Sequence, residues 1–169
     1  LKGVQTLEKN LSVNSLVGRG TVKTYAKDTL VIDNIDNLAE IMKVDLNLEN
    51  KDIKVSYNKV LAKADLNVKI LYITEDNRIN STESTIPVMS FIDIDNVSED
   101  DLFSTTYEVK NIVIKPNNVG AHSVYVEVEL EVSCEAYKKQ EIKLIQDLYS
   151  PKSNILFTQK QIKKKKKRE

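Results

Sequence analysis

The chain has 169 residues, of which 41% are hydrophobic and 30% charged, a composition typical of one or two globular domains. No run approaches the roughly 18 apolar residues of a membrane span, and the opening LKGVQTLEKN lacks the apolar run of a secretory signal. The formal net charge of zero conceals a mildly acidic body, because residues 160–169 hold seven basic side chains and one acidic one.

The first 32 residues contain two alternating segments separated by a close pair of glycines. Gly18 and Gly20 are typical of a turn, so we predict a strand, a turn and a second strand over residues 4–32. Apolar residues at helical spacing then follow Asp36, which is able to cap a helix start. This spacing predicts one or two helical turns over residues 36–43.

From residue 44 onward the chain alternates between apolar and polar residues, the period of a strand with one buried face. Pro87 cannot donate a backbone hydrogen bond, which predicts an edge position for its strand. Ser98 with the three acidic residues behind it resembles a capped helical turn, and residues 142–148 fit either a strand end or a short amphipathic helix. The predicted strands are 44–48, 53–55, 60–73, 86–94, 107–114 and 124–136, with turns at 49–51 and 57–58 and loops at 74–82 and 115–123.

Two segments that lie 64 positions apart share the same alternating pattern. VLAKADLNVKILY (60–72) and VYVEVELEVSCEA (124–136) align at six apolar positions without a gap, and each follows two shorter extended pieces. The shared order indicates a duplicated β unit, with chance similarity of alternating strands as the alternative. Half-buried strands fit antiparallel sheets packed face to face, or one sheet covered on one side. The predicted fold is therefore all-β: an antiparallel β-sandwich-like body with an internal duplication and one or two short helices.

We expect residues 1–159 to form one β domain with internal halves of about 20–73 and 86–137. Residues 160–169 are expected to be a disordered lysine-rich tail, because like charges repel and nothing apolar is available to bury. Lysines at this density contact phosphate groups at low salt, but no aromatic residues are interleaved with them, so we expect no specific nucleic-acid binding.

The sequence offers no recognisable catalytic or metal-binding constellation. His122, the single histidine, lies in a loop without a carboxylate or cysteine placed to form a relay, and Cys134 occupies the apolar register of its strand. The acidic run IDIDNVSEDD lacks the glycine and distal glutamate of a calcium loop, and GRG (18–20) lacks the rest of a phosphate loop. We predict no enzymatic activity, no catalytic residues, no metal and no cofactor, with a hydrolase that uses a hidden carboxylate pair as the alternative. The lone cysteine also indicates a reducing, cytoplasmic location.

Four segments resemble the SPOCS domain family of endospore-forming clostridia. They are DTLVI, KVLAKADLNVKILYITEDNRI, IPVMSFIDIDNVSEDD and YVEVELEVSCEAYKKQEIKLIQDLYSP, and together they lie between Asp28 and Gln159. The most specific signal is the long alternating strand that ends in ILY, followed by a polar turn and a segment that resumes with IP. The resemblance implies non-enzymatic domains that often occur in tandem and often precede a glycan-binding LysM module. This chain departs from that arrangement, because the lysine tail follows Tyr149-Ser150-Pro151.

The resemblance implies a protein-interaction or scaffold domain in assembly of the endospore coat or cortex, located in the mother cell at the forespore surface. The implied partners are envelope-assembly proteins, and any association with peptidoglycan would be indirect, through a LysM module. A cell-wall glycan-binding module is the alternative. The surfaces we expect to bind are the edge segment 86–94 and the loop 115–122.

Overall fold

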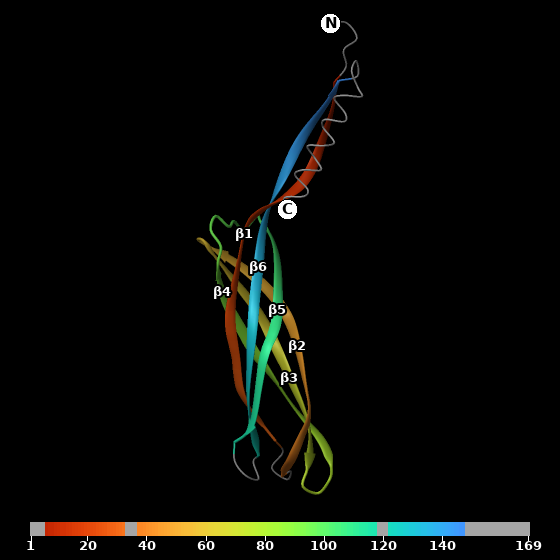
Figure 1. Ribbon diagram of the computed structural model, residues 1–169, viewed down its shortest axis with the longest axis vertical. Coiled ribbons are helices and arrows are strands. Elements are labelled where there is room, and N and C mark those ends of the chain that lie inside the picture. Colours follow the sequence, from red (N-terminus) through yellow and green to blue (C-terminus); the bar gives the residue numbers. More distant parts are fainter. Residues whose placement is uncertain (1–5, 33–36, 118–121, 148–169) are drawn as a thin grey trace.

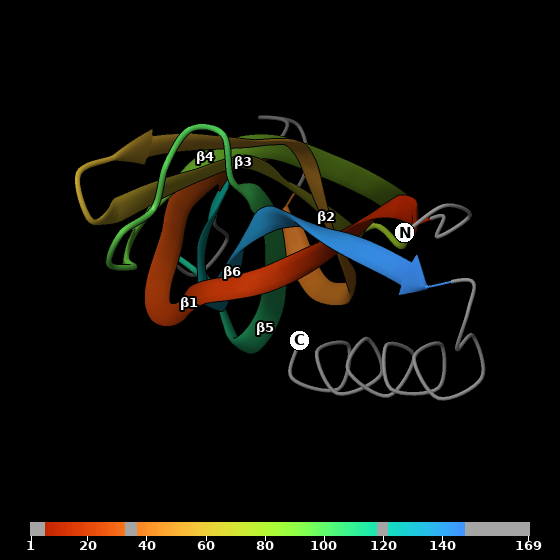
Figure 2. The ribbon, with the colours of Figure 1, turned by 90° about the horizontal axis from the view of Figure 1, so that it is seen from above.

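The computed structural model describes residues 6–32, 37–117 and 122–147, and it consists of two three-stranded antiparallel sheets packed face to face (Figures 1 and 2). One sheet has the strand order β1-β6-β5 and the other β2-β3-β4. The predicted all-β, sandwich-like fold is confirmed. Within the described residues no helix is long and apolar enough to cross a membrane. The strands are β1 (Thr6–Val31), β2 (Leu38–Ser56), β3 (Lys59–Thr74), β4 (Ile79–Asp93), β5 (Leu102–Pro116) and β6 (Ser123–Asp147).

The two repeated segments of the sequence form the centres of the two sheets. Residues 60–72 lie in β3 and residues 124–136 in β6, and every second side chain of each is buried between the sheets. Fully burying one aliphatic side chain of this size contributes about 1.5–3 kcal/mol, so these two rows dominate the core. The row members are Val60, Ala62, Ala64, Leu66, Val68, Ile70 and Tyr72 in β3, and Val124, Val126, Val128, Leu130, Val132, Cys134 and Ala136 in β6.

The order of strands along the chain is the order that a duplicated unit would give. β1, β2 and β3 occupy positions equivalent to β4, β5 and β6, because β3 lies between β2 and β4 while β6 lies between β5 and β1. The first strand of each half therefore joins the sheet formed by the other half: β1 pairs with β6, and β4 pairs with β3. The duplication itself stays a prediction, but this exchange explains why neither half closes a sheet by itself.

The predicted turn at Gly18 and Gly20 is wrong, because β1 is one continuous strand with an irregularity between Leu16 and Gly18. The glycines serve close packing instead. A Cβ atom on Gly20 would lie 2.6 Å from Ile92 Cγ2 and 2.8 Å from the Asp93 carbonyl oxygen of β4. Only a residue without a side chain lets β1 approach β4 this closely.

The short helices are also wrong. Residues 38–43 belong to β2, where Leu38, Ile41 and Val44 are half-buried three residues apart, because two register shifts each add a residue to the strand. The bulges thus place the inward apolar residues of this strand three positions apart, which is also the spacing of one face of a helix. Ser98 begins a turn closed by the Asp101 amide on the Ser98 carbonyl at 3.0 Å, and β5 starts directly afterwards.

Other boundaries are set by single asparagines. The predicted turn at 49–51 is a bulge within a continuous β2, where Asn50 adopts a φ of 53°. The turn at 57–58 is confirmed, with Asn58 at a φ of 51°. Asparagine tolerates this left-handed region better than other residues with a side chain.

Pro87 lies in an edge strand, as predicted, and β6 continues as strand through residues 142–147.

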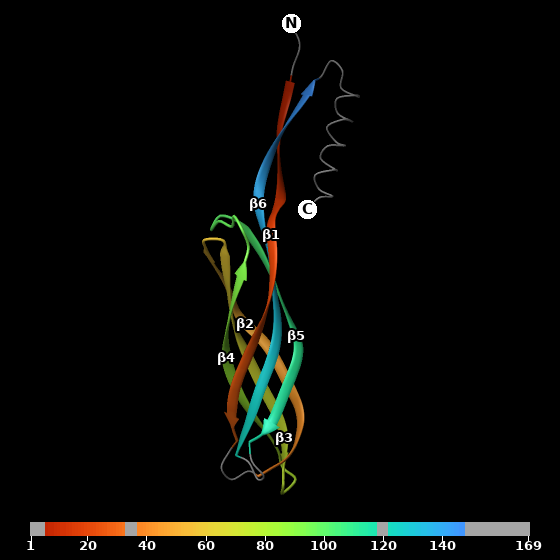
Figure 3. The same ribbon diagram turned by 60° about the vertical axis from the view of Figure 1, so that its left-hand side comes forward.

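The outer halves of β1 and β6 form a two-stranded ribbon that projects beyond the sandwich (Figures 1 and 3). β5, the third strand of this sheet, extends no further than Leu102, which pairs with Tyr137 of β6. Beyond this point β1 and β6 pair with each other alone, as far as Thr6 and Asp147. At the root of the ribbon, Lys138 Nζ lies 3.0 Å from Asp101 Oδ1. Residues 118–121 of the predicted loop and the predicted tail at 160–169 lie outside the described residues.

Candidate functional site

The two sheets meet along two lateral seams, one between β1 and β4 and the other between β2 and β5. The first seam is closed. β1 and β4 lie close together along much of their length, whereas β2 and β5 hardly approach each other. The predicted surface at residues 86–94 is therefore an edge by sheet order, but this edge faces β1, and only the outward side chains such as Met89 and Phe91 are exposed. The predicted loop surface at 115–122 falls partly outside the described residues.

Paired polar groups hold the β1–β4 seam together. Thr24 Oγ1 lies 2.7 Å from the hydroxyl of Ser90, whose residue is only 1% exposed. The Ser84 hydroxyl donates to Asp28 Oδ2 at 2.6 Å, so the seam satisfies the polar groups that it buries.

The β2–β5 seam is open, and the inward side chains of its two strands remain partly accessible. Val109 and Ile112 of β5 are 42% and 40% exposed, although both continue the apolar register of their strand. Partly exposed apolar side chains in a continuous line indicate a surface that binds something. The other apolar members of this line are Ile41, Val44, Leu46, Leu48 and Ile53 of β2 and Phe103, Tyr107 and Ile114 of β5.

Two hollows lie side by side in the upper part of the β2–β5 seam. The first, of about 440 Å³, is lined by Ile53, Lys54, Val55, Glu99 and Phe103. The second, of about 220 Å³, shares Ile53 and adds the two β5 residues that follow Phe103 on the same face, together with their neighbours on β2. Its complete lining is Lys51, Asp52, Ile53, Thr105 and Tyr107.

A bulge in β2 directs a lysine across the seam. Asn50 and Lys51 have no partners in the β2–β3 ladder, which passes from Glu49 directly to Asp52. The Lys51 ammonium lies 5.7 Å from the centre of the Tyr107 ring of β5, a cation–π distance. Among the described residues no carboxylate lies within ion-pair distance of Lys51. Bulges commonly re-aim a side chain beside a binding site.

Thr105 and Tyr107 line the second hollow, and the buried Cys134 thiol lies behind Thr105. Burial raises the pKa of the Cys134 thiol, and the Thr105 hydroxyl lies 3.9 Å from its sulfur. Burial also raises the pKa of Tyr107. Both groups are therefore neutral near pH 7, and the charged side chains that line the hollow are Lys51 and Asp52.

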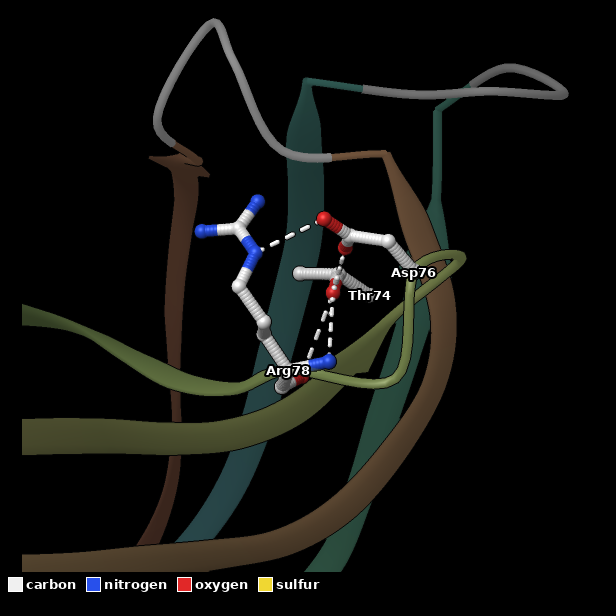
Figure 4. A network of polar contacts seen from close by, with 3 residues as sticks. All are labelled: Thr74, Asp76 and Arg78. Carbon is white, nitrogen blue, oxygen red and sulfur yellow. Dashed lines mark hydrogen bonds and ion pairs between the residues drawn. The ribbon is translucent and has the colours of Figure 1, made fainter.

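A second polar cluster fixes the turn between β3 and β4 (Figure 4). The buried Thr74 hydroxyl accepts the Arg78 amide at 3.0 Å and contacts the Asp76 carboxylate, while Arg78 Nε donates to Asp76 Oδ2 at 2.8 Å. The hydrogen bonds from Arg78 and Thr74 lower the pKa of Asp76. These groups satisfy one another, so the cluster serves the turn.

The residues that the sequence singled out for chemistry are dispersed. His122 is exposed, and its carbonyl accepts the Ile32 amide at 2.7 Å. Cys134 is buried near the middle of β6. Within the described ranges no group of three His, Cys, Asp or Glu side chains is arranged to hold a metal ion. Asp101 of the acidic run pairs with Lys138.

Sequence reasoning missed Lys51, Thr105 and Tyr107 as members of one site. The alternation of β5 did place Tyr107 and Thr105 on one face, but nothing local indicates that this face meets β2. The available signal was the Glu49-Asn50-Lys51 interruption, since an asparagine inside an alternating strand is typical of a bulge as well as of a turn.

Comparison with known proteins adds one family. Residues 37–117 match the family model described as SipL, SPOCS domain. No curated protein and no solved structure was found to match the chain. The matched range begins just before β2 and ends just after β5, so it contains both strands of the open seam. Residues 37–117 are therefore similar to the SPOCS domain family, the family that the sequence resemblance indicated.

Proposed function

We propose that the chain is a non-catalytic protein-interaction domain in assembly of the endospore envelope, acting in the mother cell at the forespore surface. The match of residues 37–117 to the SipL SPOCS domain carries this proposal. The family match supports a sporulation role, and the proposed partners are other proteins of the coat or cortex.

The geometry of the β2–β5 seam supports an interaction role. The sandwich provides a rigid frame on which an apolar surface stays accessible. Its two hollows combine apolar and aromatic side chains with charged side chains at their margins. Surfaces of this kind fit protein partners, whereas a glycan platform needs aromatic faces and hydroxyl-binding groups. The chain contains no tryptophan.

A crosslinking pull-down from sporulating cells tests the proposal. The tagged chain, with and without residues 160–169, is expected to recover the same envelope-assembly proteins, because binding resides in the β body. Loss of all recovery upon removal of the lysine tail would reduce the interaction to electrostatics. Sedimentation of the chain with purified cortex peptidoglycan, without protein partners, would replace the proposal by glycan binding.

A further inference from the structure

We infer that the β2–β5 seam binds an extended polypeptide segment that carries two apolar side chains two residues apart and a carboxylate two residues further along. This inference rests on the proposed function and names the partner chemistry of the same seam. The segment pairs with the free edge of β5 over residues 102–109 and closes the sandwich on its open side.

The spacing of the two hollows defines the apolar part of the ligand. Both lie along β5, the first at Phe103 and the second at Thr105 and Tyr107, and Ile53 of β2 borders both. Alternate side chains of an extended strand point to the same face and lie roughly 6–7 Å apart. A strand beside β5 therefore places one side chain in each hollow.

The backbone of β5 is suited to pairing in this region. β5 is an edge strand, and its ladder with β6 is regular from Leu102 to Val109, with an irregularity only after Val109. β2 is less suitable, because its ladder shifts register at three places. Strand addition to an exposed edge supplies main-chain hydrogen bonds, and the hollows supply selectivity.

Charge defines the third feature of the ligand. Lys51 faces the second hollow with the Tyr107 ring as its described contact and without a carboxylate in ion-pair range. Asp52 also lines this hollow, but its Oδ1 accepts the Ile53 amide at 2.9 Å. The first hollow is lined by both Glu99 and Lys54, whose opposite charges give no net preference for an acid there. A ligand carboxylate beyond the second hollow gains an ion pair with Lys51 that the free protein lacks.

Random dodecapeptides displayed on phage provide the test. They are selected on the full-length chain, and the enriched sequences are synthesised with a fluorophore and titrated by fluorescence anisotropy. We expect enriched peptides to carry apolar residues at alternate positions with an acid two residues beyond. Absence of enrichment, or enrichment of sequences without the acid, would overturn the inference.

Three variants locate the binding. Ile53→Arg places a charge between both hollows, and Lys51→Glu reverses the charge; each is expected to weaken binding by about tenfold or more. A peptide in which lysine replaces the acid should bind Lys51→Glu better than the unaltered chain. Met89→Arg is the matched control, since Met89 is 51% exposed on the outer face of β4, and it should leave affinity unchanged. Equal binding by all four proteins would place the peptide elsewhere.

The same variants distinguish a failure of the proposed interaction function from a failure of the seam as its binding site. Unaltered recovery of envelope proteins by folded Ile53→Arg and Lys51→Glu chains would keep the interaction function and refute the seam as its site. Circular dichroism checks folding, and Lys51→Glu keeps the test valid if Ile53→Arg does not fold.

Discussion

Each lateral seam of the sandwich joins two strands that hold equivalent positions in the two sheets, β1 with β4 and β2 with β5. One of these seams is nevertheless closed and the other is open. At the closed seam, Ala26 and Leu30 of β1 and Val88 and Ile92 of β4 are all buried. At the open seam, the inward apolar side chains of β2 and β5 are half-buried or exposed. Both pairs of strands flank the same two central strands, so the core pattern does not produce the difference.

The difference arises from backbone features that control how closely two edges approach. β1 carries glycines where it touches β4, and one hydroxyl pair and one hydroxyl–carboxylate hydrogen bond link the polar groups of the two strands. β2 and β5 carry bulges and charged side chains at the corresponding places. Bulges and lysines are the devices that keep edge strands from uncontrolled pairing.

The largest expected effect comes from filling the closed seam. Gly20→Ala introduces a Cβ atom that meets both Ile92 Cγ2 and the Asp93 carbonyl oxygen, and backbone atoms cannot yield easily. We expect a loss of about 2–3 kcal/mol in the free energy of unfolding, measured by urea denaturation. Gly18→Ala is the control, because its Cβ would meet only Ile94 Cγ2 at 2.9 Å, and it should cost less. Equal stability of Gly20→Ala and the unaltered chain would contradict the close packing.

The second prediction compares one valine from each seam. Val88 is 2% exposed in β4 and Val109 is 42% exposed in β5. Truncation of Val88 to alanine should cost about 2 kcal/mol of unfolding free energy, since it removes buried methyl groups and leaves a cavity, whereas truncation of Val109 should cost less than about 1 kcal/mol. Thermal and urea unfolding of the two variants measure the difference. Similar losses would show that the β2–β5 seam is as well packed as the other.

The sequence predicted the sheets well because strand formation and burial depend on local alternation. The rows at 60–72 and 124–136 identified both central strands and 14 of the 22 buried hydrophobic residues in the described part of the chain. Pro87 likewise marked an edge strand. These are properties that one strand carries by itself.

The seams could not be predicted because they depend on which distant edges meet. Gly18 and Gly20 indicate a turn by local rules, and their packing role appears only beside Ile92 of β4. The spacing of Leu38 and Ile41 indicates a helix unless the bulges in β2 are known. The contact between Lys51 and Tyr107 joins residues 56 positions apart, so no local pattern reveals it.

The third prediction tests the polar pairing of the closed seam. Thr24→Val removes the partner of the buried Ser90 hydroxyl, and an unsatisfied buried hydroxyl costs about 1–2 kcal/mol. The double variant with Ser90→Ala removes both hydroxyls and should recover part of this loss. A double-mutant cycle from urea denaturation measures the coupling. Additive losses would mean that the two hydroxyls do not stabilise each other.

The smallest expected effect concerns the buried thiol of Cys134, which lies behind Thr105 of the open seam. Burial raises the pKa of Cys134 above its usual value of 9.0, so the unfolded chain loses this proton at a lower pH than the folded chain does. Above about pH 9 the unfolded state binds fewer protons, and stability falls as the pH rises through the folded pKa. The contribution at pH 9.5 should be below about 1 kcal/mol. Urea denaturation at pH 8 and 9.5 should show a shallower decline for Cys134→Ala than for the unaltered chain. Tyr107→Phe serves as the comparison, because the pKa of Tyr107 is also raised by burial but from 10.0, so its effect begins at a higher pH. An identical decline with and without the thiol would mean that solvent reaches Cys134 through the seam in the folded state.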